Sequence, residues 1–102
     1  MATKYNLKPI PSSHRADVRK AVKILRRAGC KEIYVFGSIV KGSVTPDSDI
    51  DFAVRGIPPS SFFDVYGKLI GGLDHPVDLI DLESGDRFSH LLQTEGHLHR
   101  VI

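Results

Sequence analysis

Apolar residues recur along the chain at two spacings, which predict where helices and strands form. A spacing of three to four residues in the first third of the chain predicts an amphipathic helix that Ser12 or Ser13 caps and Gly29 stops. A second amphipathic helix is predicted over residues 60–72, and a third begins near Asp86. We expect the apolar stripe of the second helix to lie in the core; it consists of Phe62, Phe63, Tyr66, Leu69 and Ile70.

Shorter apolar runs, rich in β-branched and aromatic residues, predict strands between these helices. The three predicted strands cover residues 32–36, 49–54 and 76–82. A short helix is expected over 38–41, and the tail over 97–102 fits either a short strand or the end of the last helix. Helices alternating with strands predict an α/β or α+β domain in which helices cover a small sheet. The pattern leaves the direction of the third strand open.

Length and composition indicate a globular protein with one domain spanning residues 1–102. The chain is 41% apolar and 25% charged and has no low-complexity tract. Residues 1–11 read as an irregular N-terminal arm. No apolar run approaches the roughly 18 residues that a membrane span needs, and no apolar signal-peptide core follows the first residues. Cys30 is the only cysteine, and we expect it to be a small buried apolar residue of a cytoplasmic protein.

The net charge of +2 hides a strong asymmetry along the chain. The first 31 residues hold nine Lys or Arg and one acid, whereas the remainder holds five Lys or Arg and eleven acids. Such a basic helix next to an acidic region can steer a polyanion or an acidic protein partner. A solvated helix face explains the same pattern, and we favour that interpretation.

The first candidate site for chemistry follows the strand over 32–36. Gly37 and Ser38 come directly after an apolar strand and before a predicted helical turn. Gly37 lets backbone approach a ligand closely, and the Ser38 amide and hydroxyl can donate hydrogen bonds to an anion such as a phosphate. On its own, a Gly-Ser pair is too common to indicate a function.

Three aspartates occur within strands, where apolar residues are usual: Asp49, Asp51 and Asp78. Asp49 and Asp51 are two residues apart, so they face the same side of a strand and repel each other. Two Mg²⁺ ions would compensate this charge and would support transfer of a nucleotide to a hydroxyl. Asp78 would hold the metal on the side of the nucleophile and accept its proton. Asp81 is an alternative third acid, but it lies on the opposite face and more plausibly caps the strand end.

The order of these residues resembles a known family signature. Gly37-Ser38, ten intervening residues and then Asp49-Ile50-Asp51 resemble the motif of the nucleotidyltransferase superfamily related to DNA polymerase β. An apolar strand that ends in Phe-Gly-Ser and a later Val-Asp-Leu-Ile strengthen the resemblance, which covers residues 32–82 well. The short chain looks like the minimal branch of this superfamily, which is found in prokaryotes.

The resemblance implies a mixed sheet flanked by helices, two Mg²⁺ ions, and ATP as the donor of AMP to a hydroxyl. Asp49, Asp51 and Asp78 would be catalytic and bind metal, and Gly37 and Ser38 would bind the phosphates. Many members have a basic residue directly after Gly-Ser. Here that position is Ile39, so Lys41 is the candidate to supply the charge.

The resemblance also bears on the acceptor and on the function. Larger relatives carry a second helical domain that binds the acceptor, so here the acceptor would come from another protein or from a second copy of this chain. The partner implied for minimal members is a HEPN-type toxin, an RNase, for which the nucleotidyltransferase is the antitoxin. A non-catalytic antitoxin that keeps only a nucleotide pocket is the alternative function. Nucleic-acid binding through the basic helix ranks last, because no aromatic residues for base stacking accompany its charges.

Overall fold

The computed structural model describes residues 5–102. Residues 1–4 of the predicted irregular arm (1–11) lie outside the described residues, and residues 5–11 form no helix or strand. The helices are α1 (Ser12–Arg27), α2 (Ser38–Lys41), α3 (Phe62–Gly72) and α4 (Arg87–Thr94), with a 3₁₀ turn, η1 (Pro59–Ser61), directly before α3. The strands are β1 (Glu32–Phe36), β2 (Ile50–Arg55), β3 (Val77–Asp81) and β4 (His99–Arg100). The tail therefore forms a short strand, which was one of its two predicted structures.

The four strands form one mixed sheet in the order β3-β2-β1-β4. β1 pairs antiparallel with β2 and with β4, whereas β2 and β3 run parallel. The C-terminal end of β1 therefore meets the N-terminal ends of β2 and β3 at one edge of the sheet. This mixed sheet flanked by helices confirms the predicted fold class. β2 begins at Ile50 rather than at Asp49, so Asp49 belongs to the end of the preceding loop.

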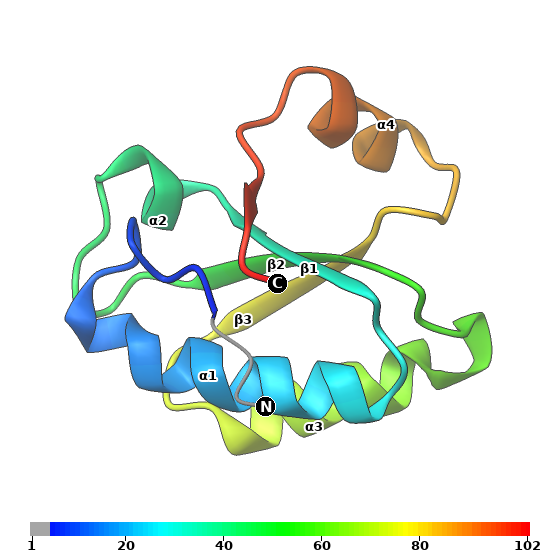
Figure 1. Cartoon of the computed structure of the whole chain (residues 1–102), viewed down its shortest axis with the longest axis horizontal. Helices are drawn as coiled ribbons and strands as arrows, with labels where there is room; N and C mark the ends of the chain where they lie inside the picture. The colour runs from blue at the N-terminus through cyan, green and yellow to red at the C-terminus, as the bar shows by residue number, and fades with distance from the viewer. Residues whose placement is uncertain (1–4) are drawn as a thin grey trace.

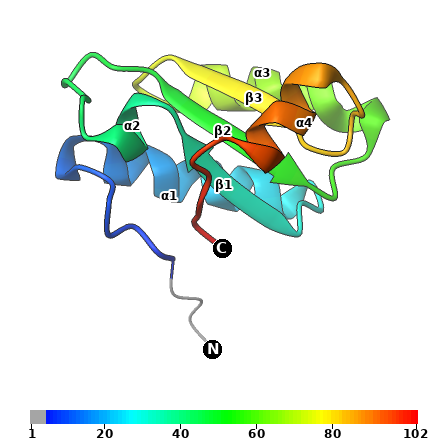
Figure 2. The same ribbon diagram turned by 90° about the horizontal axis from the view of Figure 1, so that it is seen from above.

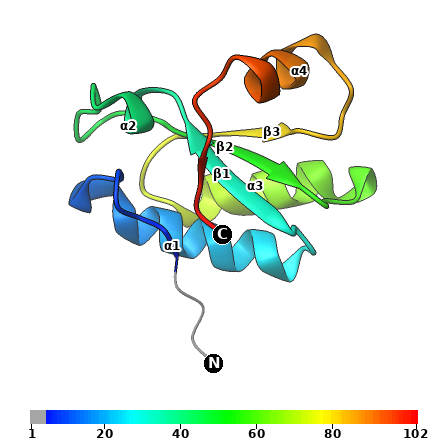
Figure 3. The same ribbon diagram turned by 45° about the horizontal axis from the view of Figure 1, so that its top comes forward.

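Two helices cover one face of the sheet. α1 and α3 lie side by side on this face, and α4 lies on the other side (Figures 1 and 3). Figure 2 shows α2 and the loop after it toward the end of the sheet away from α4. Alternate residues of β2 point to the covered face, and Ile50, Phe52 and Val54 are fully buried there. Ala53, on the opposite face, is also buried.

The start of α1 differs from its prediction. Pro11 occupies the N-cap position, and both Ser12 and Ser13 lie inside the helix without capping it. The fixed φ of proline suits the entry into a helix. The Ser13 hydroxyl instead lies 2.8 Å from Nδ1 of the buried His14. The predicted end is confirmed, because α1 ends at Arg27 and Gly29 follows with a positive φ of 99°.

The predicted apolar stripe of α3 is wrong at two positions. Phe63 is 83% exposed and Ile70 is 62% exposed, whereas Val65 and Leu69 are buried. Val65 and Leu69 are one helical turn apart and set the face that packs on α1, so Phe63 and Ile70 point away from it. Phe62 and Tyr66 pack at the margin of the core. Apolar residues on most sides of a helix do not reveal which side is buried.

Cys30 is buried, as predicted, and burial together with the charge of Asp81 raises the pKa of its thiol to about 11. A thiol with such a pKa stays protonated at neutral pH and is a poor nucleophile. Within residues 5–102, no helix is both long enough and apolar enough to cross a membrane. The cytoplasmic location stays a prediction.

Candidate functional site

Gly37 lies at the end of β1 in a conformation that only glycine adopts readily. Its φ is 77° and its ψ is −148°. A Cβ atom at this position would overlap Oδ2 of Asp51. Phe36, the residue before Gly37, pairs with Asp51 across the sheet, which explains this close approach. The glycine and the acid of the predicted motif are therefore in contact.

The sheet register brings the predicted acids to the same edge. Asp51 pairs with Asp78 across the parallel strands β2 and β3. Asp49 lies two residues before Asp51, at the end of the loop that leads into β2. Asp49 and Asp78 are exposed, whereas Asp51 is half-buried. The parallel direction of β3, which the pattern left open, is what places Asp78 beside Asp51.

Electrostatic repulsion acts on Asp51 at the centre of this group. Burial raises the pKa of the Asp51 carboxyl above its ordinary value, and the negative charges of Asp78 and Asp49 raise it further. Within residues 5–102, no protein group donates a hydrogen bond to the side chain of Asp49 or Asp51. The ionised form of Asp51 therefore lacks compensation from the protein.

Tyr66 is a residue of this region that the sequence assigned only to the core. Its hydroxyl, which comes from α3, donates a 2.9 Å hydrogen bond to Oδ1 of Asp78. The same carboxylate oxygen accepts the Leu79 amide at 3.1 Å. Burial raises the pKa of the Tyr66 phenol, and the hydrogen bond to Asp78 and its charge add to this shift. Tyr66 thus orients Asp78, and a tyrosine within an apolar stripe carried no signal of that role.

Asp81 lies apart from the other acids, at the far end of β3. It pairs with Val54, three residues beyond Asp51 along β2. Its Oδ1 accepts the amide of Glu83 at 2.8 Å and so caps the turn after the strand. This is the role that the sequence suggested for Asp81, and it leaves Asp78 as the acid beside Asp51.

The residues predicted to bind phosphate after Gly37 are Ser38 and Lys41, and they differ in position and exposure. Ser38 is half-buried at the first position of α2, directly after Gly37, where helix amides have no partner inside the helix. Ile39 is only 1% exposed and belongs to the core. The side chain after Ser38 therefore lies in the core and supplies no charge for a phosphate. Lys41 is exposed at the end of α2.

The fit of a metal ion to these residues can be judged from their chemistry. Carboxylate oxygens are the ligands that Mg²⁺ prefers, and the uncompensated charge around Asp51 favours a cation. Within residues 5–102, however, no three His, Cys, Asp or Glu side chains are grouped closely enough to hold an ion as they stand. Asp78 is turned toward Tyr66. The donor set therefore suits Mg²⁺, and rotation of side chains would be needed to close it.

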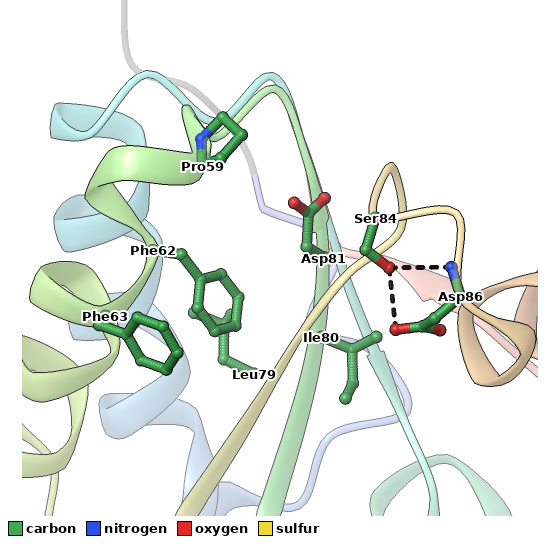
Figure 4. A pocket seen from close by; sticks show the side chains of 8 residues that line it. All are labelled: Pro59, Phe62, Phe63, Leu79, Ile80, Asp81, Ser84 and Asp86. Atoms are coloured by element: carbon green, nitrogen blue, oxygen red, sulfur yellow. Dashed lines mark hydrogen bonds between the residues drawn. The ribbon is translucent and has the colours of Figure 1, made fainter.

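An apolar hollow of the surface lies elsewhere. It has a volume of about 350 Å³ and lies between the start of α3 and the C-terminal half of β3. Figure 4 shows Phe62 and Phe63 on one side of it and Ser84 and Asp86 on the other. None of the predicted site residues lines this hollow.

Comparison with known proteins identifies a family whose sequence model matches this chain. The sequence model described as "Polymerase beta, Nucleotidyltransferase" matches residues 19–98, which include the whole of the Gly37 to Asp78 region. A search of curated proteins finds no match.

Solved structures similar to this chain include toxin–antitoxin proteins. A toxin–antitoxin structure with AMP-PNP matches with a TM-score of 0.62 and 32% identity, over 78% of this chain and 69% of that chain. An MntA–HepT toxin–antitoxin structure matches with a TM-score of 0.58 and 29% identity, over 82% and 69% of the two chains. A structure of a tri-AMPylated Shewanella oneidensis HEPN toxin with its MNT antitoxin matches with a TM-score of 0.58 and 31% identity, over 83% and 70%.

Proposed function

Because the chain belongs to the polymerase beta nucleotidyltransferase family, we propose that it transfers AMP from ATP to a hydroxyl group of another protein. The observation that carries this proposal is the meeting of Gly37, Asp51 and Asp78 at one edge of the sheet. Asp51 pairs with Asp78, and the missing Cβ of Gly37 leaves room for the Asp51 carboxylate. A phosphate-binding backbone and metal-binding carboxylates are thereby adjacent.

Asp49, Asp51 and Asp78 are the residues that would hold two Mg²⁺ ions. Bound Mg²⁺ lowers the pKa of an attacking hydroxyl and neutralises charge on the triphosphate. The Gly37 and Ser38 amides and the Ser38 hydroxyl donate hydrogen bonds to the β- and γ-phosphates, with Lys41 as the nearby cation. These contacts orient ATP for attack at its α-phosphate.

In the transfer itself, the acceptor hydroxyl oxygen forms a bond to the α-phosphorus of ATP. The bond between that phosphorus and the bridging oxygen of pyrophosphate breaks, and pyrophosphate leaves with the electron pair. Asp78 accepts the hydroxyl proton. Asp78 is exposed at the sheet edge, where an acceptor side chain can reach it.

A HEPN-type toxin is the acceptor that we propose. The support is that one similar structure holds a tri-AMPylated HEPN toxin together with its antitoxin, and another holds AMP-PNP. In such a pair the present chain would be the antitoxin, and AMP would be attached to a side-chain hydroxyl of the toxin.

Label transfer tests this function directly. The chain is incubated with Mg²⁺, the protein encoded by the adjacent gene and ATP labelled at the α-phosphate, and we expect label on the partner. ATP labelled at the γ-phosphate should leave none, which excludes phosphorylation. The double variant Asp49→Ala/Asp51→Ala should abolish transfer, whereas Asp81→Asn, an acid of β3 away from the site, should retain it.

Two results would contradict the proposal. Equal transfer by the Asp49/Asp51 double variant would mean that the reaction occurs elsewhere. If the unmodified chain transfers no label but still binds and silences the partner, as the double variant does too, the chain is a non-catalytic antitoxin.

A further inference from the structure

Two histidines that are distant in the sequence, His14 and His75, are stacked on each other in the structure. Their ring centroids are 3.9 Å apart, and their planes are inclined by 25°. His14 is fully buried in the first turn of α1, and His75 lies in the turn between α3 and β3. Asp17, one turn after His14 on α1, is 3% exposed. A buried group of polar residues needs a reason to persist in a small core.

Both imidazoles hold the loop that leads to Asp49. Nε2 of His75 lies 2.9 Å from the carbonyl oxygen of Pro46, and Nε2 of His14 lies 3.0 Å from that of Ser48. Carbonyl oxygens only accept hydrogen bonds, so both Nε2 atoms carry a proton and donate it. The loop is also closed internally, because the Thr45 amide donates to the Ser48 hydroxyl at 2.8 Å.

Asp49 is therefore held on both of its sides. The carbonyl before it, that of Ser48, accepts from His14. The amide after it, that of Ile50, donates a 2.9 Å hydrogen bond to the carbonyl of Pro76, the neighbour of His75. The backbone at Asp49 has little freedom while the two histidines stay in place.

Asp17 anchors this arrangement in the body of the protein. Its Oδ2 accepts the Asp74 amide at 3.0 Å, the His75 amide at 2.8 Å and a hydrogen bond from His75 Nδ1 at 2.7 Å. Burial raises the pKa of Asp17, but these hydrogen bonds outweigh burial and leave it below its ordinary value. An ionised Asp17 requires a proton on Nδ1 of His75. Both ring nitrogens of His75 thus have an oxygen partner, Asp17 at Nδ1 and the Pro46 carbonyl at Nε2.

We propose that His14, Asp17 and His75, here called the histidine clamp, position Asp49 for metal binding by fixing the loop before it. The three side chains act through the loop and through one another, so we class them as positioning residues. The inference rests on the proposed function in one respect, that Asp49 is a metal ligand. Mutation of a residue that orients a metal ligand typically weakens metal binding by roughly ten- to a hundredfold.

His14 offers a matched pair of variants for the test. The amide of glutamine reaches the place of Nε2, so His14→Gln keeps a donor for the Ser48 carbonyl. The shorter asparagine reaches only the place of Nδ1, so His14→Asn keeps a partner for Ser13 and loses the loop contact. Ser89→Ala is the stability control, because Ser89 is buried in the hydrogen-bond network at the start of α4.

We measure binding of Mn²⁺ alone to the full chain by electron paramagnetic resonance. Each variant is measured well below its own melting temperature. We expect His14→Asn to bind Mn²⁺ roughly tenfold more weakly than the unmodified chain. His14→Gln should stay within a fewfold of it, and Ser89→Ala should bind normally although it melts earlier. This combination separates positioning of Asp49 from a general loss of stability.

The outcomes distinguish this inference from the proposed function. If the unmodified chain binds Mn²⁺ and His14→Asn binds it equally well, the clamp is only structural and the proposed function stands. Equal weakening by His14→Gln and His14→Asn would also overturn the role of the Ser48 contact. If the unmodified chain binds no Mn²⁺, or if Asp49→Asn leaves binding unchanged, Asp49 does not bind the free metal and the clamp inference fails. The proposed function is then decided separately, by the label-transfer assay.

Discussion

The acidic residues at the two ends of the β2–β3 pair have opposite surroundings. At the end where the strands finish, Asp81 accepts the Glu83 amide at 2.8 Å, and Glu83 accepts the Gly56 amide at 2.6 Å. Asp86 begins α4 and accepts the Ser89 amide at 2.7 Å. Each of these three cap acids (Asp81, Glu83 and Asp86) has a donor from the protein. These donors belong to the fold itself, so none of the three cap acids depends on a ligand for a hydrogen bond.

At the end where the strands start lie the site acids (Asp49, Asp51 and Asp78). Asp49 and Asp51 accept no hydrogen bond from residues 5–102, whereas Asp78 accepts from Tyr66 and Leu79. Hydrogen bonds from Ser89 and Ser84 keep the pKa of Asp86 low, whereas burial and neighbouring charges raise that of Asp51. Surroundings, not residue type, thus distinguish the cap acids from the acids that we propose to be functional. A group that destabilises the free protein is retained where a ligand compensates its charge.

The largest expected effect comes from removing the charge of Asp51. Without metal ions, Asp51→Asn should raise the melting temperature by a few degrees, because it relieves repulsion with Asp49 and Asp78. The same change should reduce AMP transfer by on the order of a thousandfold, since a metal ligand contributes several kcal/mol to the transition state. Transfer assays and thermal melts in EDTA measure both effects. A variant that is less stable would show that Asp51 is a structural acid.

Gly37→Ala should be nearly as harmful to transfer, and it should lower stability as well. The positive φ of Gly37 makes an alanine there cost about 1–3 kcal/mol, and its Cβ would overlap the Asp51 carboxylate. Gly42→Ala is the matched control, because Gly42 also has a positive φ but open space around its Cβ position. If both variants lose transfer equally, backbone strain rather than contact with Asp51 explains the loss.

Asp86→Ala tests the other end of the comparison. It removes the cap of α4, so we expect the melting temperature to fall by a few degrees while transfer at 20 °C stays within a factor of about two. Figure 4 shows the Asp86 carboxylate hydrogen-bonded to Ser84 at the rim of the apolar hollow. Loss of transfer in a folded Asp86→Ala variant would indicate that this end of the sheet contributes to the reaction.

The pH dependence of stability should differ between the two ends of the β2–β3 pair, because Asp51 and Asp86 titrate in different pH ranges. The raised pKa of Asp51 means that its destabilising effect appears as pH rises above the ordinary value of 3.8 and through the raised pKa. The lowered pKa of Asp86 means that its stabilising effect is present above 3.8 and is lost as pH falls through the lowered pKa. As pH is lowered in EDTA, the rise in melting temperature caused by Asp51→Asn should therefore disappear first. The fall in melting temperature caused by Asp86→Asn should disappear only at a lower pH. Thermal melts across this range measure the order, and the reverse order would contradict it.

Local signals explain which parts of this fold the sequence could predict. The alternation before Gly37 and the turn at that glycine are local, and β1 and α2 have the predicted bounds. The acids could be grouped because the motif spacing implies neighbouring strands. The prediction of the buried face of α3 was wrong at Phe63. Packing against α1 and the sheet, which the sequence pattern does not reveal, determines that Val65 and Leu69 are buried.

The histidine clamp lay beyond sequence reasoning for a related reason. His14 reaches its loop partner across 34 residues, and His75 reaches Asp17 across 58. No spacing rule connects positions so far apart, since only the folded chain brings them together. The same holds for Tyr66, whose polar end reaches Asp78 only because α3 packs along β3.

Tyr66→Phe carries the smallest expected effect and decides to which group Asp78 belongs, since Asp78 is the site acid with protein donors. The variant removes one hydrogen bond to Asp78, worth about 1 kcal/mol, and should reduce transfer by about fivefold. The melting temperature should fall by a few degrees at most, because the Leu79 amide still donates to the exposed carboxylate. Tyr66→Leu also removes the ring and controls for packing against Phe62. A Tyr66→Phe variant that melts earlier yet transfers normally would place Asp78 with the cap acids and leave Asp49 and Asp51 as the metal ligands.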